Sequence, residues 1–243
     1  MSGYEQDQRS RRRAAMRRRR RRRQRRIMLA CLMLAALFIV GGAVFGILRW
    51  KSMKERRAFA EQGVAAAVSG DYEAAIAAFD QALEKAHGRI GDFETDVLLN
   101  RAEAEYRQQD YAAALNSYQL LLEEDPKNET AKKGAVLCLV ETGAYDQALE
   151  LNVLQSQVYN RLAVDQIEAG NYDRAMEYIT QGRGFADGTA ARDLDFNEMV
   201  VWEMRLDFQK ALKLLETYVQ KYGSDERAER ELAFLRSRQG NQT

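Results

Sequence analysis

The chain has 243 residues, a length that allows one ordinary domain and an anchor, and its formal charge of +1 conceals two oppositely charged parts. Residues 1–26 carry thirteen Arg against two acidic residues, for a net charge of +11. Residues 58–243 carry 19 Lys or Arg against 33 Asp or Glu, for a net charge of −14. A single proline and frequent Ala, Leu, Glu, Gln and Arg favour helices joined by short turns over a sheet. Two cysteines are too few for a disulfide framework.

An uncharged apolar segment, residues 27–48, separates these two parts. As a helix it would span about 33 Å, enough to cross a hydrocarbon core of about 30 Å. The apolar run is longer than that of a signal peptide, and Arg49-Trp50-Lys51 follows it where a small-residue cleavage site would stand. We therefore predict a single transmembrane helix at residues 27–48. A cleaved signal sequence and a buried helix of a soluble protein are the alternatives.

The basic flanks predict the orientation of this helix. Thirteen Arg precede it and five Lys or Arg follow it in residues 49–57, so the positive-inside rule places the N-terminus in the cytoplasm. The expected layout is a disordered Arg-rich cytoplasmic tail at residues 1–26, a juxtamembrane linker at 49–55, and an extracytoplasmic domain of a single-pass cell-membrane protein. We expect the tail to contact anionic lipid headgroups. Nucleic acid is disfavoured as a partner, because residues 9–26 hold no aromatic side chain to stack on bases.

Beyond residue 52 a short pattern recurs, in which a turn tripeptide ends in an aromatic residue and alanine follows three residues later. The copies are Gly70-Asp71-Tyr72 with Ala75, Gln109-Asp110-Tyr111 with Ala114, Gly143-Ala144-Tyr145 with Ala148, Gly170-Asn171-Tyr172 with Ala175, and the weaker Leu206-Asp207-Phe208 with Ala211. Such a pattern is typical of a helical hairpin. Gly or Gln ends the first helix, Asp or Asn caps the second, and alanine lets the two helices approach closely.

These residues resemble the tetratricopeptide repeat (TPR) family, whose unit is about 34 residues of paired antiparallel helices. Residues 95–128 match best, with Pro126 where the family ends its unit, and residues 56–89 carry Phe59 and Gly63 at the family's first-helix positions. Further units are expected at 129–155, which is short, 156–189 and 192–224, then a capping helix at 225–238 and a tail at 239–243. The predicted fold class is all-α: a TPR-like α-solenoid of helical hairpins over residues 56–238, preceded by the single transmembrane helix. An irregular helical bundle is the alternative, but it would not explain the recurring spacing.

No residue pattern marks an active site. His87 is the only histidine, which excludes histidine-based dyads and multi-histidine metal sites. Gly182-Arg183-Gly184 lacks the Lys-Ser/Thr of a phosphate-binding loop. Carboxylates are plentiful, but nothing singles out a pair. The chain is therefore predicted not to be an enzyme and to need no cofactor.

The resemblance implies a concave groove lined by the first helix of each unit. The partner-binding residues that it implies are Leu99, Asn100, Glu103, Tyr106, Arg107, Lys133, Leu137, Asn160, Arg161 and Val164, with Asp96, Thr130, Gly134, Val140, Glu141, Gln157, Ile167 and Glu168 at related positions. This mixture of amide, charged and apolar groups suits an extended or helical peptide. Alternatively, some of these side chains only support neighbouring repeats. Asn100-Arg101-Ala102 resembles part of a cochaperone carboxylate clamp, but the remaining clamp cations are missing.

We therefore predict a membrane-tethered protein–protein interaction adaptor or scaffold that uses this groove. Its partners would be other proteins or peptides, with a preference for basic segments because the domain is acidic. Two alternatives stay open. One is a structural or self-associating envelope protein, and the other is an accessory subunit whose basic tail binds anionic lipid or nucleic acid.

Overall fold

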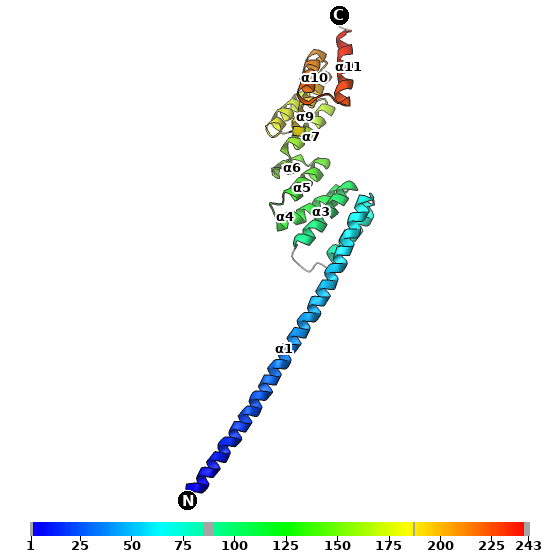
Figure 1. Cartoon of the computed structure of the whole chain (residues 1–243). Coiled ribbons are helices and arrows are strands. Elements are labelled where there is room, and N and C mark those ends of the chain that lie inside the picture. Colours follow the sequence, from blue (N-terminus) through cyan, green and yellow to red (C-terminus); the bar gives the residue numbers. More distant parts are fainter. Residues whose placement is uncertain (1, 85–89, 187, 241–243) are drawn as a thin grey trace. The chain divides into compact units, whose positions relative to one another are not determined.

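The computed structural model describes residues 2–84, 90–186 and 188–240, and every helix or strand assigned in these ranges is an α-helix (Figure 1). The predicted all-α fold class is confirmed. In chain order the helices are α1 (Ser2–Val68), α2 (Tyr72–Glu84), α3 (Asp92–Arg107), α4 (Tyr111–Glu124), α5 (Glu129–Glu141), α6 (Tyr145–Glu150), α7 (Gln155–Glu168), α8 (Tyr172–Arg183), α9 (Gly188–Met204), α10 (Phe208–Tyr222) and α11 (Glu226–Gly240). The chain divides into two compact units, Met1–Ala58 and Phe59–Thr243.

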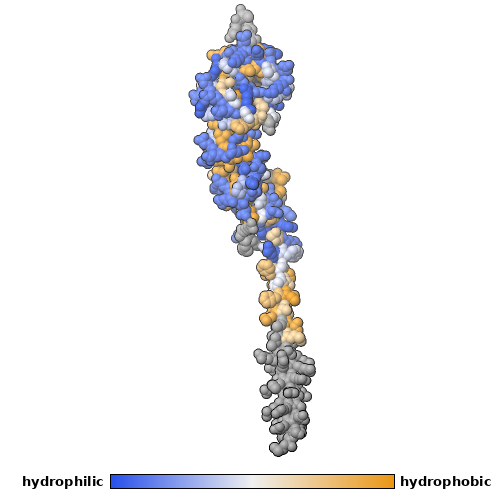
Figure 2. Space-filling view, turned by 90° about the vertical axis from the view of Figure 1, so that its left-hand side faces the viewer, coloured by the Kyte–Doolittle hydropathy of each residue, from blue (hydrophilic) through white to orange (hydrophobic). Residues whose placement is uncertain are grey.

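The first unit contains helix α1 alone, as far as Ala58. Residues 2–26 and 49–55, predicted as a disordered tail and a linker, are helical here. Arg, Gln, Ala and Met favour helix, and residues added to an existing helix need no new nucleation. Side chains from Leu32 to Trp50 are exposed, and Figure 2 shows the apolar ones in orange. Within the described residues, one helical segment, Leu32–Val68, is long and apolar enough to cross a membrane. None of its most apolar stretch is buried.

In the residues that the structure describes, the second unit consists of five helical hairpins and a final helix. Residues 59–68 of α1 pack with α2, and the other hairpins are α3 with α4, α5 with α6, α7 with α8, and α9 with α10, followed by α11. Each second helix also contacts the first helix of the next hairpin, and α3, α5, α7 and α9 contact one another in that order. We call these four helices the inner row. This arrangement confirms the predicted solenoid, because each hairpin packs mainly on its neighbours.

Each hairpin reverses direction through one left-handed residue. These residues are Gly70, Gln109, Gly143, Gly170 and Leu206. At the first turn the Gly70 amide donates to the Ala67 carbonyl at 3.1 Å, and the Asp71 amide donates to the Ala66 carbonyl at 3.0 Å. The other four turns repeat these two bonds, which satisfy carbonyls that the helix end would leave without partners. The Asp71, Asp110 and Asp207 carboxylates then each accept a backbone amide and cap the second helix.

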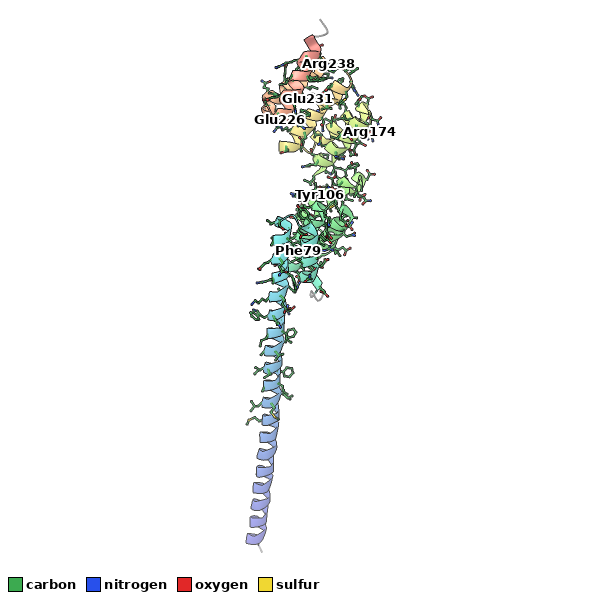
Figure 3. All side chains as sticks on the ribbon, turned by 90° about the vertical axis from the view of Figure 1, so that its right-hand side faces the viewer. Phe79, Tyr106, Arg174, Glu226, Glu231 and Arg238 are labelled. Carbon is green, nitrogen blue, oxygen red and sulfur yellow. The ribbon has the colours of Figure 1, made fainter. Side chains whose placement is uncertain are left out.

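Small residues in the first helices receive aromatic rings from the second helices. Phe79, labelled in Figure 3, is fully buried over Gly63, where an added Cβ would lie 2.5 Å from the ring. Tyr118 of α4 lies over Gly134, the sixth residue of α5, which is the first helix of the next hairpin. Gly134 was expected to face the groove, and the structure instead buries it under the preceding hairpin. A glycine is required at both positions because a methyl group would overlap the ring.

An ion-pair network centred on Arg101 of α3 joins the first two hairpins. Glu105 is 2% exposed, and its carboxylate accepts a hydrogen bond from Ser117 at 2.7 Å and pairs with Arg101 at 2.8 Å. Arg101 also pairs with Asp80 of α2 at 2.7 Å. Burial raises the pKa of Glu105, because the bond from Ser117 and the charge of Arg101 only partly offset the loss of solvation.

A second network joins the last two hairpins around Asp195 of α9. Its carboxylate accepts bonds from Arg183 of α8 at 2.8 Å, and from Lys221 and Tyr222 of α10 at 2.9 and 2.8 Å. Burial opposes ionisation of this carboxyl. The bonds from Lys221, Tyr222 and Arg183 outweigh that effect and lower the pKa of Asp195.

Leu206→Gly is expected to stabilise the fold by about 1 kcal/mol, since a left-handed residue with a Cβ costs roughly 1–2 kcal/mol and glycine entropy offsets part of the gain. Leu206 is 72% exposed, so few contacts are lost. Urea unfolding followed by circular dichroism measures the change. Leu120→Gly is the matched control: Leu120 is 46% exposed within α4, where the same substitution should destabilise by about 1 kcal/mol. A loss of stability in both variants would contradict the strained turn.

The two carboxylates predict opposite pH dependences. Relative to Glu105→Gln, the wild-type free energy of unfolding should fall as pH rises above the ordinary value of 4.5, because the native state binds that proton more tightly than the unfolded chain. Relative to Asp195→Asn, it should fall as pH drops below the ordinary value of 3.8. Unfolding curves of both pairs from roughly pH 3 to pH 7 measure these differences. If the difference in free energy of unfolding between wild type and variant changed with pH in the same direction for both carboxylates, the opposite pKa shifts would be refuted.

Candidate protein-binding surface

Side-chain bonds link neighbouring helices of the inner row. The Tyr106 hydroxyl of α3 donates to Glu141 of α5 at 3.4 Å, and the Asn197 amide of α9 donates to Asn160 of α7 at 2.8 Å. Burial, and then the nearby Glu141 carboxylate, raise the pKa of Tyr106, so its hydroxyl stays a donor at neutral pH. Tyr106 is labelled in Figure 3. Three of the residues predicted to bind a partner, Leu99, Tyr106 and Asn160, therefore also contribute to packing between hairpins.

All ten predicted groove residues lie on α3, α5 or α7, and the structure divides them by exposure. Those that are exposed are Asn100, Glu103, Arg107, Lys133, Leu137 and Arg161. Those that are half-buried are Leu99, Tyr106, Asn160 and Val164. Leu99 and Tyr106 pack against the core cluster around Tyr118 and Cys138. The first group is accessible to a partner, whereas the second contributes largely to the fold.

Some of the exposed polar groups have partners within their own helices. Arg107 donates to Glu103 at 2.7 Å, Arg161 lies 3.2 Å from Asp165, and the Asn100 amide donates to the Asp96 carbonyl at 2.8 Å. Such exposed pairs contribute little to stability, so an incoming charged group can replace them. Leu137 adds an apolar side chain, 41% exposed, to the face of α5.

Arg101, which resembles a cation of a carboxylate clamp, has a structural role instead. Arg101 bonds Asp80, Glu105 and Ser117 between α2, α3 and α4. Its guanidinium is therefore engaged in joining two hairpins. Sequence reasoning did not find this network, because an acidic residue in a helix is ordinarily solvent-exposed.

An open polar cavity lies at the turn of the fourth hairpin, away from the predicted residues. Its lining comprises Gln166, Gly170, Asn171, Tyr172, Asp173, Arg174 and Arg205. Arg205 of α9 pairs there with Asp173 of α8. No group of three His, Cys, Asp or Glu residues in the described ranges is placed to hold a metal. His87 lies outside the residues that the structure describes.

The chain is similar to one sequence family and to several solved structures. The sequence model of the tetratricopeptide repeat family matches residues 60–129 and 99–152. A tetratricopeptide repeat protein from Parabacteroides merdae superposes with a TM-score of 0.55 at 18% identity, covering 77% of this chain and 74% of that chain. The MamA protein gives a TM-score of 0.49 at 16% identity, covering 71% of this chain and 97% of that chain. No curated protein matches the sequence.

The P. merdae structure shows similarity of fold alone at this level of identity. The family match covers the hairpins from the end of α1 to α6, and the same left-handed turn recurs in the hairpins beyond it. Residues 60–152 therefore belong to the tetratricopeptide repeat family, and the hairpins beyond them share its fold.

Proposed function

We propose that the protein is a membrane-tethered adaptor that binds a segment of another protein along its inner row. Tetratricopeptide repeats imply a scaffold for protein–protein interaction and generally carry no catalytic chemistry. The observation that best supports the location is the set of exposed side chains on three successive first helices. They are Asn100 on α3, Lys133 and Leu137 on α5, and Arg161 on α7.

The proposed partner segment is extended or helical and carries basic residues. Amide and charged groups spaced along the inner row suit hydrogen bonds to a peptide, and Leu137 can contact an apolar side chain. The net charge of −14 over residues 58–243 attracts basic segments from a distance and repels acidic ones. Added salt should weaken this preference, because it screens the exposed carboxylates.

We further propose that residues 27–48 anchor the protein in the cell membrane as a single pass. Support comes from the exposed apolar side chains of Leu32–Leu48 and from the Arg-rich segment before them. The excess of Arg on the N-terminal side favours a cytoplasmic tail and an extracytoplasmic repeat domain. In this orientation the tail lies beside anionic headgroups of the inner leaflet.

The groove is tested with the triple variant Asn100→Asp, Lys133→Glu and Arg161→Glu in the full chain. Affinity capture from detergent-solubilised membranes, read by quantitative mass spectrometry, should lose specific partners of the wild-type protein. The reason is that the variant removes one amide and two cationic groups that would donate hydrogen bonds to the partner, and long-range attraction to an acidic domain does not replace these contacts. Helical circular dichroism and the unfolding midpoint should stay near those of the wild type, since all three side chains are exposed.

The matched control places the same charge change on the second helices and the final helix. Gln119→Glu, Lys213→Glu and Arg236→Glu are exposed positions on α4, α10 and α11, and capture should be retained. Equal capture by both variants would exclude the inner row as the binding surface. If the captured partner is only a second copy of the chain, the self-associating structural protein replaces the adaptor.

A further inference from the structure

The third hairpin is incomplete, because its second helix stops early. Helix α6 has 6 residues, whereas α2, α4, α8 and α10 have 13, 14, 12 and 15. In the complete hairpins a large buried side chain lies nine residues after the left-handed turn; these are Phe79, Tyr118, Ile179 and Leu215. Asn152 occupies that position in the third hairpin and is exposed. At this position the third hairpin therefore lacks the fully buried side chain of the other second helices, and the segment after Glu150 is held by the partly buried Leu151, Val153 and Leu154 instead.

The turn between α6 and α7 has a strained backbone. Asn152 and Leu154 have φ values of 55° and 50°, in the left-handed region that a side chain disfavours. Leu154 directly precedes α7 and gives it no side-chain cap. Ser156 is 3% exposed, and its hydroxyl makes no hydrogen bond in the described structure. The start of α7 thus lacks the side-chain cap that α4, α5 and α10 have, and the side-chain bonds at this turn are the exposed ones from Gln155 to Asn152 and from Asn152 to the Glu150 carbonyl.

Contacts across this junction are mainly apolar. Val136, Leu139, Ala148 and Val158 form one buried cluster from α5, α6 and α7. In the described ranges no side-chain hydrogen bond or ion pair joins α5 to α7, whereas Tyr106–Glu141 joins α3 to α5 and Asn160–Asn197 joins α7 to α9. A bond from the Tyr145 hydroxyl of α6 to Asp165 of α7 crosses the junction at 2.5 Å. Apolar contacts are not directional, so they permit small rotations that fixed ion pairs resist.

We propose that the junction between α6 and α7 is a hinge that joins two arms, residues 59–150 and 155–240. Rocking about it changes the alignment of α5 with α7, while each arm keeps its own ion-pair network around Glu105 or Asp195. The Tyr145–Asp165 bond limits the rotation at one edge. Motion of this type occurs on microsecond to millisecond times. If the inner row binds a partner as proposed above, the hinge sets the spacing between Lys133 and Arg161 that the partner meets.

Pulsed electron spin resonance on the full chain in lipid nanodiscs tests the hinge directly. Spin labels at Gln119 and Gln181 report across the junction, and labels at Glu73 with Gln119 and at Gln181 with Lys213 report within each arm. All four positions are exposed on second helices. Of the two natural cysteines, only Cys31 is replaced, by alanine. Cys138 can stay, because it is buried and its pKa is raised to about 11, which keeps its thiol unreactive.

The expected result is a broad or two-peaked distance distribution across the junction and a narrow single peak within each arm. Tyr145→Phe should broaden the cross-junction distribution further and leave both within-arm distributions unchanged, because it removes only the interactions of the hydroxyl with Asp165 and Arg161 of α7. Three equally narrow distributions would overturn the hinge. Equal broadening of all three by Tyr145→Phe would also overturn it, since that result would mean general loosening of the fold.

Discussion

The left-handed residue at the end of each first helix is the constraint on which the repeat unit depends. It allows two backbone hydrogen bonds to close the turn, so the second helix returns antiparallel to the first. Because the turn is the same in all five hairpins, the alanine five residues later always meets the first helix, and Ala75, Ala114, Ala148, Ala175 and Ala211 are fully buried. Gln109 and Leu206 adopt this conformation without being glycine, which shows that tertiary packing can hold the turn against its intrinsic preference.

Repetition of one turn also explains how neighbouring hairpins come to share a core. The residue nine positions after the turn packs either on its own first helix, as with Phe79 over Gly63, or on the first helix of the next hairpin, as with Tyr118 over Gly134. Ion pairs around Glu105 and Asp195 then lock the first two and the last two hairpins. The third hairpin departs from this scheme where Asn152 replaces the apolar residue, and there the helix is short.

The turn tripeptides were sufficient to predict the fold, because their spacing repeats with the hairpin. Even the weak copy at Leu206-Asp207-Phe208 forms the same turn as Gly70-Asp71-Tyr72. Contacts between hairpins were less predictable. The burial of Gly134 depends on a ring from the preceding hairpin, and the burial of Glu105 depends on Arg101 and Ser117 lying beside it. The groove residues could be placed on the first helices by resemblance, but which of them are exposed depends on how α3, α5 and α7 pack.

We propose that the repeat domain, and with it the inner row, lies on the outer side of a membrane. The most direct test measures on which side the domain is accessible. Single cysteines at Glu73 and at Ser10, in a Cys31→Ala background, are treated with a membrane-impermeant maleimide in right-side-out membrane vesicles. The cysteine at position 73 should react in sealed vesicles, and the one at position 10 only after the membrane is opened, because the proposed orientation keeps the Arg-rich tail on the cytoplasmic side. Reaction at position 10 alone in sealed vesicles, or recovery of the protein in the soluble fraction, would contradict the proposed arrangement.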